Sequence, residues 1–233
     1  MTNRVKSTPA KPSIPPLESG DRLSRTEFER RYEAMSEHTK AELIEGIVYM
    51  ASPLRFERHA EPHGQLIVWM GMYQLSTPGV KLGIEPTIRL DEDNEPQPDG
   101  VLLIDSLAGG SAEITEDDYL QGAPEFVAEI AASSAAYDLH DKKRAYRRNG
   151  VAEYLVWQRF ENRLHWFVLT DSEYISLAPD ADGTIRSRVM PGLWLAADAL
   201  LQGNMQQVLS VLQAGLNSDE HQTFVQQLAE RLA

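Results

Sequence analysis

The stretch EFVAEIA at residues 125–131 is the strongest indication of the fold class, because it is short and mostly apolar and carries Glu129 inside its apolar part. The stretch DGVLLID at residues 99–105 has the same character. Apolar runs of this length, rich in β-branched residues, are typical of central strands that are covered on both faces. The two runs therefore predict central strands of a sheet that is flanked by helices.

Helical patterns lie on both sides of these runs. A polar helix is expected from Ser24 to about Lys40, since the residues SRTE at 24–27 form a capping-box pattern in which Ser24 accepts from the Glu27 amide. Asp138 is expected to be the N-cap of a later helix that Gly150 ends. Apolar residues at helical spacing predict further helices at 61–75 and over most of 195–233.

Strand patterns fill most of the remaining chain. Short runs rich in β-branched and aromatic residues predict strands there, and a hairpin is expected near Pro179–Gly183. The expected strands are residues 42–50 after the first helix, a region from Lys81 to Leu90, and residues 153–157, 163–169 and 173–177.

The order of these elements predicts an α/β fold with a mixed central sheet and a C-terminal helical tail. We expect three parts. Residues 1–23 form a flexible arm with four prolines, residues 24–195 form the domain, and residues 196–233 form a helical extension. The apolar C-terminal helices fit either a cover for the sheet or a dimer contact.

Composition excludes several classes of protein. The 233 residues include no cysteine, which excludes disulfides, thiolate metal sites and cysteine nucleophiles. No apolar run reaches the roughly 18–20 residues of a membrane span, and no signal peptide is evident, so a cytoplasmic location is expected. The 22 basic and 35 acidic residues give a net charge of −13, which disfavours non-specific binding to nucleic acid but permits a local basic patch or a metal bridge.

Two acids stand out at the predicted central strands. Asp99 opens one strand after Pro98, and Glu129 lies inside the other. A carboxylate buried without a partner is costly, so a cation, a metal ion or a cleft is expected beside Glu129. Acids that converge at one end of a sheet provide the oxygen ligands that Mg²⁺ prefers.

A charged helix follows the second of these strands. Asp138, Lys142 and Tyr146 are spaced four residues apart and share one helix face. Residues 142–148 also form the densest basic run of an acidic chain. This run fits either phosphate binding or an ordinary solvated face.

Five short motifs, in order, resemble the Uma-type restriction endonuclease family of the PD-(D/E)XK nuclease superfamily. The resemblance covers roughly residues 24–193 and implies a restriction-endonuclease-like core. The motifs are ELIEG at 42–46, QPD at 97–99, EI at 129–130, Asp138-x-x-x-Lys142-x-x-x-Tyr146, and GVAEY at 150–154.

The resemblance implies a metal-dependent endonuclease that hydrolyses DNA. Asp99 and Glu129 correspond to metal-binding acids, and Glu42, at the expected junction of helix and strand, corresponds to an accessory acid for Mg²⁺ or Mn²⁺. The superfamily lysine would stand two residues after Glu129, where this chain has Ala131. Lys142 is the expected substitute in the catalytic set. Cleavage of both strands by a single-site nuclease favours a homodimer.

Other interpretations stay open at this stage. Ala131 and the net charge of −13 also fit a catalytically inactive nuclease fold that binds or regulates. An acidic interaction protein that binds a partner through its terminal helices is a third reading. Lys142 also fits a surface ion pair with Asp138, and a structural role is the simpler reading of Tyr146, His59 and His63.

Overall fold

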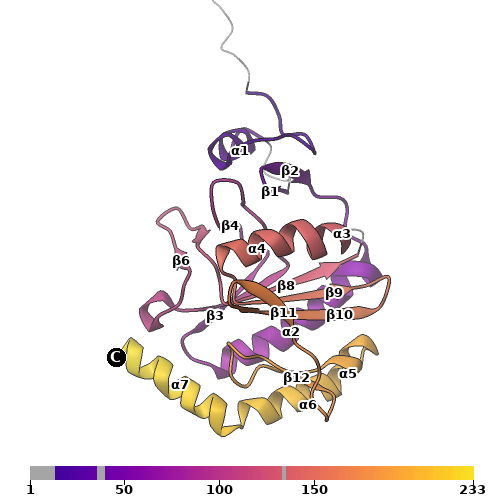
Figure 1. The fold of residues 1–233 in the computed structure, drawn as a ribbon, viewed down its shortest axis with the longest axis vertical. Coiled ribbons are helices and arrows are strands. Elements are labelled where there is room, and N and C mark those ends of the chain that lie inside the picture. Colours follow the sequence, from indigo (N-terminus) through magenta and orange to yellow (C-terminus); the bar gives the residue numbers. More distant parts are fainter. Residues whose placement is uncertain (1–13, 36–39, 133–134) are drawn as a thin grey trace, which may run out of the picture.

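A six-stranded mixed sheet lies at the centre of the computed structural model, which describes residues 14–35, 40–132 and 135–233 (Figure 1). The strand order is β11-β10-β9-β8-β5-β3. Only the pair β8–β9 is parallel within this sheet. Its strands are β3 (Val80–Ile84), β5 (Gly100–Ile104), β8 (Phe126–Ala131), β9 (Glu153–Gln158), β10 (Arg163–Thr170) and β11 (Glu173–Ser176). The expected α/β class and mixed sheet are confirmed.

The two apolar runs form central strands, β5 and β8, as predicted, and the structure shows that these two strands are neighbours. Every residue of both strands is buried, since other strands flank them and helices cover both faces. Their antiparallel register pairs Gly100 with Ala128. Continued by one residue, this register sets Asp99 beside Glu129 at one edge of the sheet.

Helices cover both faces of the sheet (Figure 1). Helix α2 (Glu61–Ser76) lies on one face, where Trp69 meets Phe126 and Trp166 edge-on. Helix α4 (Lys143–Asn149) lies on the other face, where Tyr146 joins a second apolar cluster. Trp157 and Trp166 are about 1% exposed, which confirms their expected packing role.

Three C-terminal helices extend the layer of α2 (Figure 1). They are α5 (Ala197–Leu201), α6 (Met205–Leu216) and α7 (Asp219–Leu232). Helix α6 packs against α2 and against the strand pair β12 (Thr184–Arg186) and β13 (Trp194–Ala196). Its residues Val208 and Leu212 belong to the same apolar cluster as the sheet and α2. The C-terminal helices therefore cover the central core.

The hairpin expected near residues 179–183 needs correction. A turn does occur there, since the Gly183 amide donates to the Asp180 carbonyl. The strand that follows the turn, β12, pairs with the later β13 and not with β11. Strands β4 (Ile88–Arg89), β6 (Glu113–Ile114) and β7 (Leu120–Gln121) form a separate small sheet.

The N-terminal part differs from the expectation. Helix α1 spans only Arg25–Tyr32, and residues 36–39 of the longer predicted helix lie outside the described residues. Ser24 is the N-cap but makes no capping hydrogen bond with any described residue, and the Glu27 carboxylate binds Arg30 and Arg31. Two hairpin strands follow, β1 (Ala41–Ile44) and β2 (Ile47–Met50).

Residues 14–23 pack against this hairpin, although the sequence predicts a flexible arm there. Leu17 is buried, the Gly20 amide donates to Val48, and the Leu23 amide donates to Gly46. Residues 1–13 of the predicted arm lie outside the described residues. Across the ranges that the structure describes, none of the helices has the length and apolar character needed to cross a bilayer.

Candidate active site

Three acids from separate elements meet at one edge of the sheet. Asp99 precedes β5, Glu129 lies within β8, and Glu42 lies within β1. Glu42 is therefore inside a strand and not at a junction of helix and strand, as the sequence had suggested. Its carboxylate is held by the Gln97 amide, which donates to Glu42 Oε1 at 2.7 Å and so ties the hairpin to the segment before Asp99.

These acids line a cleft of about 550 Å³. All four residues expected in the site, Glu42, Asp99, Glu129 and Lys142, contribute to its wall. The cleft also carries positive and aromatic side chains, namely Lys40, Arg55, Arg58 and Phe160. The guanidinium of Arg58 lies 5.0 Å from the centre of the Phe160 ring. The acids are thus enclosed by a wall that contains cations.

The helix that carries Lys142 begins earlier than predicted. Helix α3 (Ala135–Tyr137) runs into a π-helical turn at Asp138–Lys142 and then into α4. Asp138 is therefore inside the helix and is not its N-cap. Gly150 does end the helix, as expected, in a left-handed conformation with φ of 87°. π-Helical turns occur frequently at functional sites.

Lys142 lies at the centre of the acids. Its ammonium nitrogen is 2.8 Å from Oε1 of Glu129, 2.8 Å from Oε1 of Glu42 and 3.9 Å from Oδ1 of Asp138. Both Lys142 and Asp138 are buried. The alternative of a solvated surface pair between Lys142 and Asp138 is therefore wrong, since the ammonium is enclosed by carboxylates.

Burial dominates the electrostatics of this cluster. It raises the pKa of Glu129 and of Asp99 to about 7 each, although the positive charge of Lys142 opposes both shifts. Burial alone would lower the pKa of Lys142, but Glu129, Glu42 and Asp138 raise it well above its ordinary value. Lys142 is therefore charged, and burial shifts the pKa of both Glu129 and Asp99 toward neutral pH.

Tyr146 is a contact residue of the site that sequence reasoning had assigned to packing. It is fully buried, and its hydroxyl donates to Oε1 of Glu129 at 3.1 Å. The signal was present in the sequence, because the four-residue spacing from Asp138 through Lys142 already placed Tyr146 on the same helix face.

Two histidines contact Asp99. Nε2 of His59 lies 3.1 Å from Oδ1 of Asp99, and Nε2 of His63 lies 2.8 Å from the Asp99 carbonyl oxygen. The other carboxylate oxygen, Oδ2, accepts from the Ile130 amide at 2.6 Å. Burial, with a smaller effect of the neighbouring His63, lowers the pKa of His59. Their spacing of one helical turn is the signal in the sequence that relates the two histidines.

The donor set fits a divalent cation. Lys142 carries one positive charge and contacts three carboxylates, and Asp99 adds a fourth acid to the same cleft. Asp99 is close enough to Glu129 to raise its pKa. A divalent ion would offset this excess of negative charge, and carboxylate oxygens are suitable ligands for it.

The basic run after Lys142 does not face the cleft. Arg144 and Arg148 pair with Glu45, and Arg147 pairs with Glu173 at 2.6 Å. Lys143 lies 3.5 Å from the centre of the Phe167 ring. These contacts support the interpretation of the run as a charged outer face.

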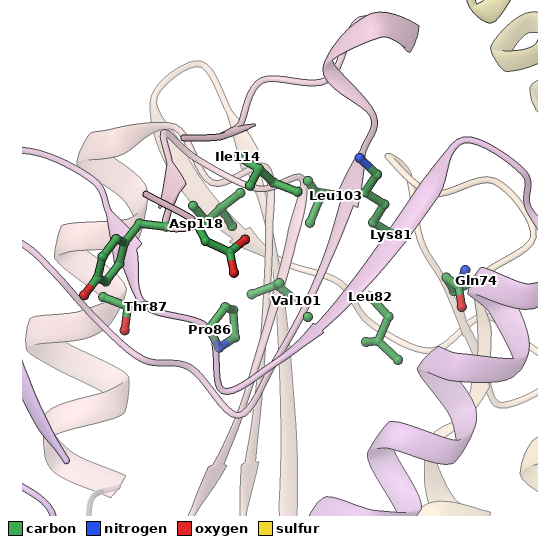
Figure 2. Close-up of a pocket in the computed structure, with 12 residues that line it drawn as sticks. Gln74, Lys81, Leu82, Pro86, Thr87, Val101, Leu103, Ile114 and Asp118 are labelled. Atoms are coloured by element: carbon green, nitrogen blue, oxygen red, sulfur yellow. The ribbon is translucent and has the colours of Figure 1, made fainter. Parts of the chain in front are cut away.

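A second cavity, of about 470 Å³, lies beside β3 and β5 (Figure 2). Its lining includes Lys81, Val101, Leu103, Ile114 and Asp118, and none of the four expected site residues. The Lys81 ammonium is already paired with Asp105 at 2.8 Å. The cleft at Lys142 is therefore the stronger candidate for chemistry.

Comparisons with known proteins identify the family and a similar fold. A crystal structure described as a "putative nuclease belonging to DUF820" from Anabaena variabilis ATCC 29413 has a similar fold, with a TM-score of 0.52 and 13% sequence identity. The similarity covers 78% of this chain and 97% of that one. Among curated proteins, no sequence matches the chain. The model of the Uma2 family, described as "Putative restriction endonuclease", matches residues 25–198. The chain therefore belongs to the Uma2 family.

Proposed function

We propose that this protein is a divalent-metal-dependent endonuclease that hydrolyses phosphodiester bonds in DNA. One observation carries the proposal: the Lys142 ammonium lies 2.8 Å from both Glu129 and Glu42 in a cleft that Asp99 also lines. Acids and a lysine gathered in this way are suited to phosphoryl chemistry, and membership of the Uma2 family supports the assignment.

Each residue has a defined role in this proposal. Asp99, Glu129 and Glu42 would hold Mg²⁺ or Mn²⁺. Such an ion, when bound, polarises a phosphate and lowers the pKa of water. The Lys142 ammonium would orient the attacking water and offset charge that develops on the phosphate oxygens. Tyr146, through its hydrogen bond to Glu129, would keep that carboxylate in position.

Ala131 accounts for the position of the lysine. It stands two residues after Glu129 on β8, so both side chains are on the same face of the strand. Ala131 is fully buried in the apolar cluster that contains Tyr146. The ammonium group that the superfamily pattern places on the strand is here replaced by that of Lys142, which comes from the helix above the same face.

The cations at the cleft would serve substrate binding. Lys40, Arg55 and Arg58 line it, so a phosphate backbone would meet positive charge locally despite the net charge of −13. We expect affinity to fall with rising salt concentration, because each phosphate contact releases counterions. We also propose that the protein is a homodimer, because cleavage of both DNA strands by a single-site nuclease favours two copies. We further propose a cytoplasmic location.

Cleavage of supercoiled plasmid tests the proposal. We expect wild-type protein to nick the plasmid with Mg²⁺ or Mn²⁺ and to be inactive with EDTA. Asp99→Asn should lower the rate by about 100-fold or more, in line with the loss of one transition-state contact. Asp105→Asn is the matched control, because Asp105 lies at the opposite end of β5 and pairs with Lys81. Equal cleavage by Asp99→Asn and wild type would refute the proposal.

A catalytically inactive nuclease fold that binds or regulates is the second candidate. It is favoured by the net charge of −13 and by the engagement of Arg144, Arg147 and Arg148 in ion pairs. This candidate predicts no cleavage and no change in thermal stability when Mg²⁺ or Mn²⁺ is added. Calorimetry with and without each ion distinguishes it, since an ion that binds the folded state raises the melting temperature.

A further inference from the structure

The two histidines at Asp99 form a group that the proposed chemistry does not use. One ring nitrogen of His59, one ring nitrogen of His63 and a carboxylate oxygen of Asp99 all lie within 4.8 Å of one another. Their rings are nearly parallel, with centres 5.6 Å apart. His59 and Asp99 are buried and also line the cleft, so the group is open to solutes from one side.

Asp99 differs from the other acids in the partners of its carboxylate. Glu129 and Glu42 both contact the Lys142 ammonium at 2.8 Å. The Asp99 carboxylate instead contacts the Ile130 amide and, at 3.1 Å, Nε2 of His59. The cluster therefore has two parts. In one, the Lys142 ammonium contacts Glu42 and Glu129, and in the other, the Asp99 carboxylate contacts the His59 imidazole.

The hydrogen bonds around the histidines resemble those around metal ligands. Nε2 of His63 lies 2.8 Å from the main-chain oxygen of Asp99, and a carbonyl oxygen can only accept, so this contact fixes the tautomer and orientation of the ring. His59 and His63 are one turn apart, at the junction of the π-helical turn Phe56–Ala60 and α2. The π-helical turn carries His59 and the first turn of α2 carries His63, so the two rings are held on continuous helical backbone.

The geometry points to a metal centre in which His59 and His63 join Asp99, so that imidazole nitrogen binds the ion together with carboxylate oxygen. This inference deepens the proposed function and rests on it for the role of Asp99. It also changes the class of cofactor. Imidazole favours later transition metals such as Co²⁺ or Zn²⁺, whereas Mg²⁺ prefers an all-oxygen environment, and Mn²⁺ accepts both kinds of ligand. Two imidazoles with one carboxylate leave other coordination positions open for water or phosphate.

The first test measures nitrogen coordination directly. Protein loaded with one equivalent of Mn²⁺ is examined by pulsed electron paramagnetic resonance, which detects ¹⁴N nuclei bound to the ion. We expect imidazole couplings in wild type and weaker couplings in both His59→Gln and His63→Gln. His140→Gln is the matched control, because His140 is exposed, and it should retain the full signal.

The second test separates the two kinds of ion. In calorimetric titrations with CoCl₂ and MgCl₂, we expect His59→Gln to weaken Co²⁺ binding by about 10-fold or more, since loss of even an outer-shell partner costs about 10- to 100-fold. Mg²⁺ affinity should change by less than about twofold, because the imidazole contributes little to a magnesium site. Circular dichroism of each variant confirms that the fold is retained.

Three outcomes contradict the inference. They are bound Mn²⁺ without ¹⁴N coupling, coupling that survives in both histidine variants, and failure of wild type to bind Mn²⁺ or Co²⁺. Bound Mn²⁺ without ¹⁴N coupling, together with plasmid cleavage, would refute the histidine site and leave the proposed function intact. Coupling without plasmid cleavage would support the histidine site and refute the nuclease.

Discussion

The ammonium nitrogen of Lys142 lies 2.8 Å from Oε1 of Glu129, although the two residues belong to a helix and to a central strand. The superfamily pattern would place this lysine on the strand, at the position of Ala131. Because Ala131 is small and buried on the same strand face, the helix can bring Lys142 to the acid. The contact pairs a lysine with a carboxylate, as we propose for the lysine of the superfamily pattern.

The enclosed position of Lys142 predicts a stability effect. Lys142→Met should lower the free energy of unfolding by about 3–5 kcal/mol, because it leaves the buried Glu129 and the partly buried Glu42 without their cation. Urea denaturation at about pH 8 measures this loss. The double variant Lys142→Met/Glu129→Gln should recover part of it, since the orphaned charge is removed. A double variant less stable than Lys142→Met would contradict the explanation.

The Tyr146 hydroxyl predicts a smaller effect. Tyr146→Phe should cost about 1.5–3 kcal/mol, the usual range for a hydrogen bond to a charged group, because Glu129 loses a donor. Tyr154→Phe is the matched control, since the Tyr154 hydroxyl donates to the neutral carbonyl of Asp138. Its cost should be about 0.5–1.5 kcal/mol. Equal losses in urea titrations of the two variants would show that Tyr146 has no special relation to the acid.

Glu95 predicts a pH dependence of stability. It is 2% exposed, and burial, together with the nearby Glu29, raises its pKa to about 8. Because the folded-state pKa lies above the unfolded value, Glu95 favours folding at low pH, and this contribution is lost as the pH rises through about 8. Glu95→Gln should have the same free energy of unfolding as wild type at about pH 5. At about pH 9 it should be more stable than wild type by roughly 1–3 kcal/mol.

The control for this prediction is Glu92→Gln, because Glu92 lies three residues before Glu95 and its side chain is 77% exposed. Its stability should follow that of wild type across the whole pH range. If Glu95→Gln also follows wild type between these pH values, then the Glu95 carboxyl does not carry a raised pKa.

The packing of the C-terminal helices predicts a steric effect. A Cβ at Gly215 of α6 would collide with the Gly192 carbonyl oxygen and the Trp194 ring. Gly215→Ala should therefore destabilise the whole protein by about 1–3 kcal/mol in a single unfolding transition. Gly64→Ala in α2, where a Cβ meets no atom within 4 Å, should be neutral or slightly stabilising. Separate transitions for Gly215→Ala would show that residues 196–233 unfold independently.

The central strands were predictable because burial on both faces leaves a continuous apolar run, as in residues 125–131. The ordered motifs singled out four residues that line one cleft in the structure, and their catalytic role stays a prediction. The start of the helix at Ala135 was not predictable, because Asp138 is a favourable N-cap residue in sequence. In the structure Asp138 lies inside the helix, near the Lys142 ammonium. The sequence alone does not distinguish an aspartate that caps a helix from one that is buried beside a lysine.

The contacts of the histidines could not be predicted for a different reason. His63 meets Asp99 across 36 residues, and that contact depends on how α2 packs under the sheet. The burial of Lys142 likewise depends on the β1–β2 hairpin, which brings Glu42 to the cleft. A helix with five basic residues between positions 142 and 148 is interpreted as a surface helix from sequence alone, because these distant elements are not visible there.

We propose that Lys142 acts at the scissile phosphate. Single-turnover cleavage of plasmid DNA with Mn²⁺ tests this claim. Lys142→Met is compared with Lys143→Met, which removes the adjacent ammonium that lies over Phe167. Both variants are assayed at a temperature where each is folded. We predict that Lys142→Met lowers the rate by about 100-fold or more and that Lys143→Met stays within about threefold of wild type. Equal rates for folded Lys142→Met and wild type would contradict the claim.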